Sequence, residues 1–63
     1  MKGKTVITSK EQSPYLMGWE KYKDVADIDV KQSMVVWKFK TEDEAYRASQ
    51  LFMNLGCEYV QRV

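Results

Sequence analysis

Hydrophobic and polar residues alternate along residues 34–40, which is the pattern of a strand whose two faces meet different surroundings. Val35, Trp37 and Phe39 share one face, and because all three are large and apolar we assign that face to the core. The opposite face begins with the apolar Met34 and ends in lysines. Apolar residues on both faces favour a central strand over an edge strand.

A helix is predicted directly after this strand, between Thr41 and Gly56. Thr41 and Glu44 fit a capping box, in which each side chain reaches the backbone N–H of the other residue. Gly56 stands where a residue with left-handed backbone geometry ends a helix, and residues 57–63 are predicted to form the last strand. Between these limits the apolar residues recur at helical spacing and make one stripe: Ala45, Ala48, Leu51, Phe52 and Leu55.

The first half of the chain is less regular. Residues 4–9 are predicted to form a strand, but residues 14–23 allow two interpretations. Ser13 and Pro14 are typical of a helix start, and apolar side chains then recur at helical spacing. Gly18 weakens a helix interior, and the aromatic residues of this segment are also common in strands. We favour the helix and keep the strand as the alternative.

Residues 25–31 alternate cleanly between apolar and charged side chains, which is typical of an edge strand protected from pairing with another chain. Gln32 and Ser33 are predicted to turn this strand back into residues 34–40 as a hairpin. Neither residue is the glycine or asparagine that short hairpin turns prefer, so a longer turn stays open. One face of the strand carries Ala26, Ile28 and Val30, and the other carries Asp27, Asp29 and Lys31.

These elements predict a single α+β domain spanning residues 1–63. With a helix at residues 14–23 the order is βαββαβ, the ferredoxin-like two-layer sandwich, whose first and third strands are central. With a strand there, the chain is an antiparallel β-meander packed by one α-helix, ββββαβ or βββαβ. Both architectures place a helical layer on one face of the sheet and leave the other face open.

Composition narrows the class of protein. The chain has 63 residues, 44% of them hydrophobic, so it buries a modest core and is expected to bind a partner or to form a homodimer. Its net charge of +1 offers no general attraction to nucleic acid or to an anionic membrane. A single cysteine excludes an internal disulfide, and no signal peptide or membrane span is recognisable. We therefore expect a cytoplasmic protein.

The residues needed for catalysis or metal binding are scarce. Histidine is absent, which removes the commonest general base and metal ligand. Cys57 precedes Glu58 at a helix end, whereas reactive thiols need positive charge nearby, so we expect a half-buried core residue. Asp24, Asp27 and Asp29 are the main carboxylate cluster outside the helix cap, and a solvated edge explains them better than a cation site. The sequence thus predicts no enzyme, no metal and no cofactor.

Two kinds of binding site fit the remaining residues. An exposed patch of Trp, Tyr and Met is typical of protein interfaces, and it is the interpretation we favour. It predicts a protein-binding site formed by Trp19, Tyr22, Met34, Val36 and Lys38. The alternative is a single-stranded nucleic-acid platform, in which aromatic residues on the open sheet face stack on bases and lysines contact phosphates. Its lysines are Lys21, Lys23, Lys38 and Lys40.

Residues 33–63, with their strand, threonine-capped acidic helix start, glycine stop and strand, resemble units found in small phage-encoded inhibitors of host proteins. They are also similar to half of many ferredoxin-like modules. The resemblance covers about half of the chain and carries over no site residue. It implies an inhibitor or adaptor of phage or bacterial origin that occludes the surface of a partner protein. Self-association through the open face or the C-terminal edge strand is compatible with this role.

Overall fold

A computed structural model describes residues 3–63. The elements follow the order β1 (Thr5–Ser9), α1 (Gln12–Tyr22), β2 (Asp27–Val30), β3 (Met34–Lys38), α2 (Glu42–Asn54) and β4 (Val60–Arg62). The α+β class is confirmed, and the disputed segment forms the helix α1, which ends at Tyr22, so the β-meander alternative is wrong. Within the described residues no helix combines the length and the apolar character needed to cross a membrane.

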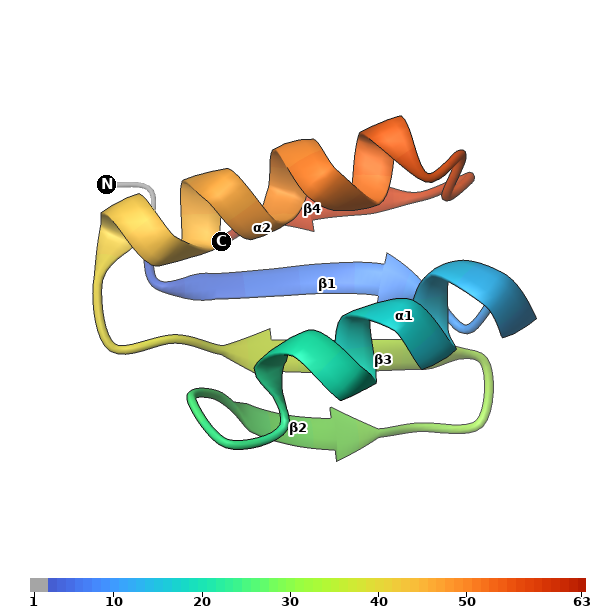
Figure 1. Ribbon diagram of the computed structural model, residues 1–63, viewed down its shortest axis with the longest axis horizontal. Helices are drawn as coiled ribbons and strands as arrows, with labels where there is room; N and C mark the ends of the chain where they lie inside the picture. The colour runs from blue at the N-terminus through green and yellow to red at the C-terminus, as the bar shows by residue number, and fades with distance from the viewer. Residues whose placement is uncertain (1–2) are drawn as a thin grey trace.

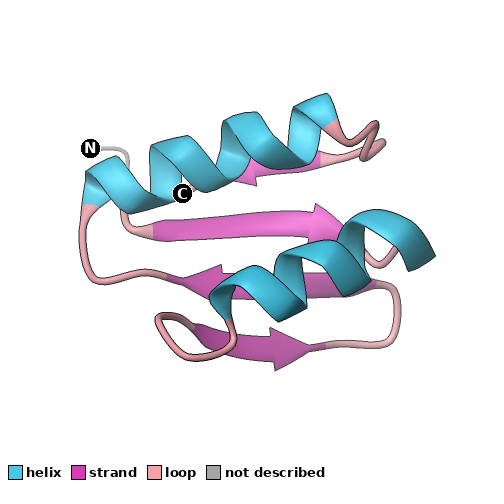
Figure 2. Cartoon of the chain, in the orientation of Figure 1, coloured by secondary structure: helices cyan, strands magenta, loops and turns pink. Residues whose placement is uncertain are grey.

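The strands form one antiparallel sheet in the order β2-β3-β1-β4. Figure 1 shows α1 and α2 side by side over the same face of this sheet, with α2 lying over β1 and β4. Figure 2 shows that the connections between elements gather at the two ends of the strands. The prediction that the first and third strands are central, and the second and fourth are edges, is confirmed.

The core lies between the helices and the sheet. Trp37 is fully buried there, and its ring lies 4.8 Å from the ring of Phe52, centroid to centroid. The Trp37 indole N–H donates a 3.0 Å hydrogen bond to the hydroxyl of Thr8, which is also buried. This bond removes the penalty for burying both polar groups. The buried apolar residues are Val6, Val35, Trp37, Phe39, Ala45, Ala48 and Phe52.

The start of α1 differs from the prediction, because Glu11 and not Ser13 is the N-cap. The Glu11 carbonyl accepts the backbone N–H of Tyr15 at 2.9 Å, which opens the helix two residues early. The Glu11 carboxylate does not cap the helix; it accepts the Glu58 N–H at 2.7 Å. Pro14 therefore lies within the first turn, where its missing N–H has no helical partner to lose.

Helix α1 approaches the core through Gly18, which is buried. A Cβ atom at this position would lie 2.4 Å from Cε1 of Phe52 and 3.1 Å from Cη2 of Trp37. Because real Cβ atoms do not approach other atoms this closely, only glycine fits here without movement of the core. The residue that weakens the helix pattern in the sequence is thus the one that lets the helix pack.

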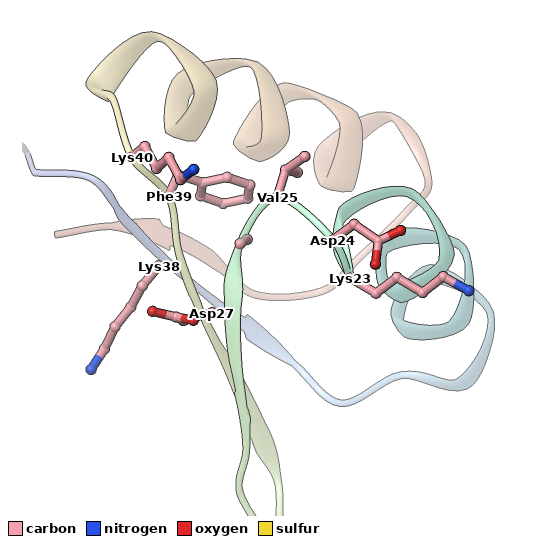
Figure 3. Close-up of a pocket in the computed structure, with 8 residues that line it drawn as sticks. Lys23, Asp24, Val25, Asp27, Lys38, Phe39 and Lys40 are labelled. Atoms are coloured by element: carbon pink, nitrogen blue, oxygen red, sulfur yellow. The ribbon is translucent and has the colours of Figure 1, made fainter.

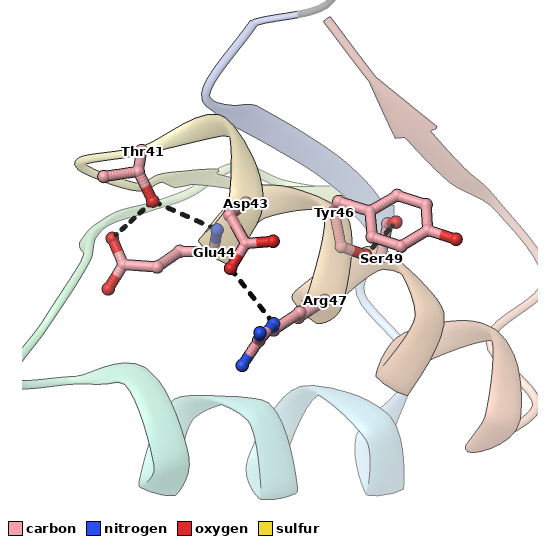
Figure 4. A network of polar contacts seen from close by, with 6 residues as sticks. All are labelled: Thr41, Asp43, Glu44, Tyr46, Arg47 and Ser49. Atoms are coloured by element: carbon pink, nitrogen blue, oxygen red, sulfur yellow. Dashed lines mark hydrogen bonds and ion pairs between the residues drawn. The ribbon is translucent and has the colours of Figure 1, made fainter.

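The ends of α2 follow the predicted capping pattern with one change. The Thr41 hydroxyl accepts the Glu44 N–H at 3.1 Å, as predicted. The Glu44 carboxylate, however, accepts from the Thr41 hydroxyl at 3.2 Å and not from the Thr41 N–H (Figure 4). At the other end Gly56 has a φ of 86°, and the Cys57 N–H donates to the Phe52 carbonyl at 3.1 Å. Glycine tolerates this left-handed geometry at little cost.

The buried stripe of α2 is shifted from the predicted one. Leu51 and Leu55 are only half-buried, whereas Ser49, which the predicted stripe does not include, is buried. Its hydroxyl donates a 2.6 Å hydrogen bond to the Tyr46 carbonyl, so the polar atom is satisfied within the helix (Figure 4). This local bond explains why a polar residue is tolerated against the sheet.

The hairpin between β2 and β3 has the predicted two-residue turn. The Lys31 N–H donates to the Met34 carbonyl at 2.7 Å, and Gln32 and Ser33 lie between them. No residue other than glycine has a positive φ within residues 3–63, so this turn is not of the type that short hairpins prefer.

Candidate protein-binding surface

The sheet face opposite the helices, which we call the open face, has no helix over it (Figure 1). Val6 and Trp37 turn toward the helices, so the residues next to them on β1 and β3 turn the other way. Strand register extends the open face across all four strands. Its residues are Thr5, Ile7, Ser9, Asp27, Asp29, Met34, Val36, Lys38 and Gln61.

The centre of the open face is apolar. Ile7 and Val36 lie directly opposite each other on β1 and β3, and both are half-buried among their neighbours. Met34 follows along β3 and is 37% exposed. Lys38 lies on the same face at the other end of β3. Three of the five predicted contact residues, Met34, Val36 and Lys38, therefore share the open face.

Charged residues of both signs border this apolar centre. Asp27 is the cross-strand neighbour of Lys38, and the Lys31 ammonium lies 3.0 Å from a carboxylate oxygen of Asp29. Each acid thus has a lysine beside it, and the face carries no strong charge of one sign. Such a surface suits a partner with an apolar patch and a mixed polar rim.

The other two predicted contact residues lie in the helical layer, on the opposite side of the sheet. Trp19 is 40% exposed on α1, and the Lys23 ammonium lies 5.3 Å from its ring centroid. Tyr22 packs edge-on against Phe39, with ring centroids 5.1 Å apart, and burial raises the pKa of its phenol above the ordinary value. The fold therefore does not bring Trp19 and Tyr22 together with Met34, and one continuous patch containing all five residues does not exist.

Three of the four lysines predicted for the nucleic-acid alternative line one pocket. Lys23, Lys38 and Lys40 line a pocket of about 270 Å³, together with Asp24 and Asp27. Figure 3 shows the Lys23 and Lys38 side chains pointing in opposite directions from this pocket. The two carboxylates offset much of the positive charge.

Lys21, the fourth of these lysines, lies at a neighbouring pocket of about 240 Å³ between the helices, which Arg47 also lines. Arg47 forms a 3.1 Å ion pair with Asp43 one turn earlier on α2 (Figure 4). Trp37 and Phe39 are buried, so neither ring can stack on a base. This segment therefore offers no aromatic ring on the open face for a base to stack on, as the nucleic-acid alternative requires.

Cys57 is half-buried, and its sulfur lies 3.3 Å from the Ser9 hydroxyl. Among residues 3–63 no group of three or more cysteine or acidic side chains is arranged to hold a metal ion. The aspartates of β2 instead lie along an exposed strand edge.

Two exposed apolar residues of α2 escaped the sequence analysis. Tyr46 and Met53 are 50% and 52% exposed, and they are seven residues apart, so they share one side of the helix. The Arg62 guanidinium lies 5.2 Å from the Tyr46 ring centroid, which places that side next to β4. The sequence could have indicated this second apolar side of the helix, because Tyr46 and Met53 are seven residues apart and neither belongs to the predicted buried stripe.

Comparisons with protein-family models, with curated proteins and with solved structures each found no match.

Proposed function

We propose that this chain is a small cytoplasmic protein-binding domain that acts by covering part of a partner protein's surface, as an inhibitor or adaptor. The observation that carries the proposal is the open face. Its apolar centre, with Ile7, Met34 and Val36, has no helix packed on it. Exposed apolar residues ringed by polar ones are typical of protein interaction sites. A cytoplasmic location is supported by the single Cys57, which leaves no internal disulfide to form.

We also propose that the fold is ferredoxin-like. The strand order β2-β3-β1-β4, with two helices over one face, supports this assignment. In such a sandwich the strands are held from one side only, so the other side is free for a partner. The fold thus supplies a rigid platform, and the open-face side chains supply the contacts.

A matched pair of methionine substitutions tests which face binds. Met34→Glu puts a charge on the open face, while Met17→Glu puts the same charge on α1, where Met17 is 55% exposed. Both variants are compared with the parent chain as bait in a bacterial lysate treated with nuclease, and each captured protein is then titrated directly against the three chains. We expect Met34→Glu to weaken binding at least about tenfold and Met17→Glu to leave it unchanged. Equal affinities for all three chains would refute the open face as the site.

Single-stranded nucleic-acid binding is the second candidate, because three lysines line one pocket: Lys23, Lys38 and Lys40. If phosphate contacts dominate, the affinity for a labelled oligonucleotide must fall steeply as salt is raised, and Lys40→Gln must reduce that slope by about one unit. An affinity that does not respond to salt would eliminate this candidate.

A further inference from the structure

The outer side of β4 carries backbone groups that β1 does not use. Tyr59 bonds toward β1, since its carbonyl accepts the Ser9 N–H at 3.1 Å. Residues of an antiparallel strand alternate in the direction of their N–H and C=O groups. Val60 and Arg62 therefore turn these groups away from the sheet, along its exposed edge. An edge of this kind is a template for another strand.

The two edges of the sheet are not equally protected. The β2 edge carries alternating charges, with Asp29 and Lys31 paired at 3.0 Å, and such charges discourage strand addition. The β4 edge is short, its two charges are not paired with each other, and it is flanked in the helical layer by the exposed Tyr46 and Met53. This difference favours β4 over β2 as the edge that pairs with an additional strand.

Opposite charges flank the centre of this edge symmetrically. Glu58 precedes Val60 by two residues, and Arg62 follows it by two. Glu58 is exposed, and within residues 3–63 neither Glu58 nor Arg62 forms an ion pair with another side chain. An acid just before β4 and a base at its end thus lie at equal distances along the chain from Val60.

We propose that β4 pairs with β4 of a second copy of this chain, antiparallel and centred on Val60. This register sets Val60 opposite the same residue of the second copy, and sets each Glu58 opposite an Arg62 across the two-fold axis. Each Val60 N–H donates to the facing Val60 carbonyl, and each Arg62 N–H donates to the facing Glu58 carbonyl. The Glu58 N–H already donates to the Glu11 carboxylate at 2.7 Å, so each outer pair forms one of the two hydrogen bonds that a regular ladder would give it.

The proposed pair joins the two sheets into one continuous sheet, with all four helices on the same side. Tyr46 and Met53 then lie between the two copies of α2, which removes their exposed apolar surface from water. The open face is not used in this contact. Self-pairing and the proposed partner binding can therefore occur together, and each can fail without the other.

Charge reversal at the two flanking positions tests both the edge and its register. The full chain, Glu58→Arg, Arg62→Glu and the double variant are each followed by sedimentation equilibrium over a range of concentrations, with circular dichroism as the check on folding. We expect the parent chain to reach twice its monomer mass of 7.4 kDa. Each single variant should raise the dissociation constant by about tenfold or more, because like charges then face each other at both pairs.

The decisive step is a mixture of the two single variants. Glu58→Arg and Arg62→Glu are complementary only in the Val60-centred register, so the mixture should form a heterodimer, and the double variant should regain self-association. A parent chain that stays monomeric at every concentration would overturn the proposal. So would a dimer that both single variants leave intact but Met34→Glu dissociates, because that result assigns the contact to the open face.

Discussion

Gly18→Ala is the substitution for which sequence and structure give opposite expectations. Judged from helix propensity alone, alanine in the middle of α1 should stabilise the chain by about 1 kcal/mol. The structure places the new methyl group 2.4 Å from Cε1 and 2.7 Å from Cζ of Phe52. Phe52 is fully buried and cannot swing into solvent. We therefore expect the steric term to outweigh the propensity term.

The magnitude follows from these two terms. Forcing an extra methyl group into a packed core costs about 1–3 kcal/mol, because side chains and backbone must shift. The neighbours of Gly18 are themselves constrained, since Phe52 packs on Trp37 at a centroid distance of 4.8 Å. After the propensity gain of about 1 kcal/mol is subtracted, the net loss in the free energy of unfolding should be at most about 2 kcal/mol. For a domain of this size a loss of about 2 kcal/mol corresponds to a drop of about 8–16 °C in melting temperature.

Urea denaturation followed by tryptophan fluorescence measures this loss. Ser13→Ala is the control, because Ser13 is exposed on the same helix and should change the midpoint little. Phe52→Leu should relieve the clash, so the double variant Gly18→Ala with Phe52→Leu should be more stable than the sum of the single effects predicts. A Gly18→Ala chain more stable than the parent would refute the close approach of α1 to Phe52.

Further predictions concern single polar groups, caps and one titrating phenol, and denaturant midpoints measure each of them. Thr8→Val should cost about 1–3 kcal/mol by leaving the buried Trp37 indole N–H without its acceptor, whereas Thr8→Ser should retain most of the stability. Thr41→Ala should cost about 1 kcal/mol through loss of the α2 cap, with Thr41→Ser as the neutral control. Gly56→Ala should cost about 1–2 kcal/mol, all of it from backbone strain at φ 86°, because no atom lies within 4 Å of the added Cβ. Burial raises the pKa of Tyr22, so the folded chain holds the phenol proton more tightly than the unfolded chain does, and the free energy of unfolding should fall as pH rises above about 10. Tyr22→Phe should reduce this loss of stability at alkaline pH. An unchanged dependence of stability on pH in Tyr22→Phe would contradict the prediction.

Local signals in the sequence predicted the second half of the fold well. The Thr41 cap and the Gly56 stop act through bonds within a few residues of each other, so their geometry follows from residue type and spacing alone. The alternation along residues 34–40 likewise identified Val35 and Trp37 as core residues, and both are fully buried. The prediction was less accurate where two donors compete for one acceptor: the Glu44 carboxylate accepts from the Thr41 hydroxyl and not from the Thr41 N–H.

The first half of the fold was harder to predict, because the contacts that fix helix α1 join residues that are far apart in the sequence. Glu11 occupies the N-cap position of α1 in place of Ser13, but its carboxylate binds the Glu58 N–H, 47 positions away in the chain, and not the helix. From the sequence alone Gly18 only weakens the helix, and its role becomes clear only from its close contact with Phe52 of α2. Neither contact can be inferred from periodicity, since both depend on how the two halves of the chain meet.

The five residues predicted for the protein-binding site lie on two sides of the sheet, and this too depends on how distant parts of the chain meet. Trp19 and Met34 were grouped because exposed aromatic and methionine residues favour interfaces, but the choice of helix for residues 14–23 places them on opposite sides of the sheet. Once that helix is accepted, alternation along β3 alone suffices to predict that Met34, Val36 and Lys38 stay together.

The distribution of aromatic residues bears on which kind of partner the open face fits. Trp37, Phe39 and Phe52 are buried, and Tyr22 packs on all three rings. A chain of 63 residues needs most of its large rings to build a core, so few remain for stacking on bases. The open face is left with aliphatic side chains at its centre and balanced charges at its rim, as with Val36 between its neighbours Ile7 and Asp29. Such a surface gains from excluding water against another apolar surface and gains little from a phosphate backbone, which is why a protein partner is the stronger proposal.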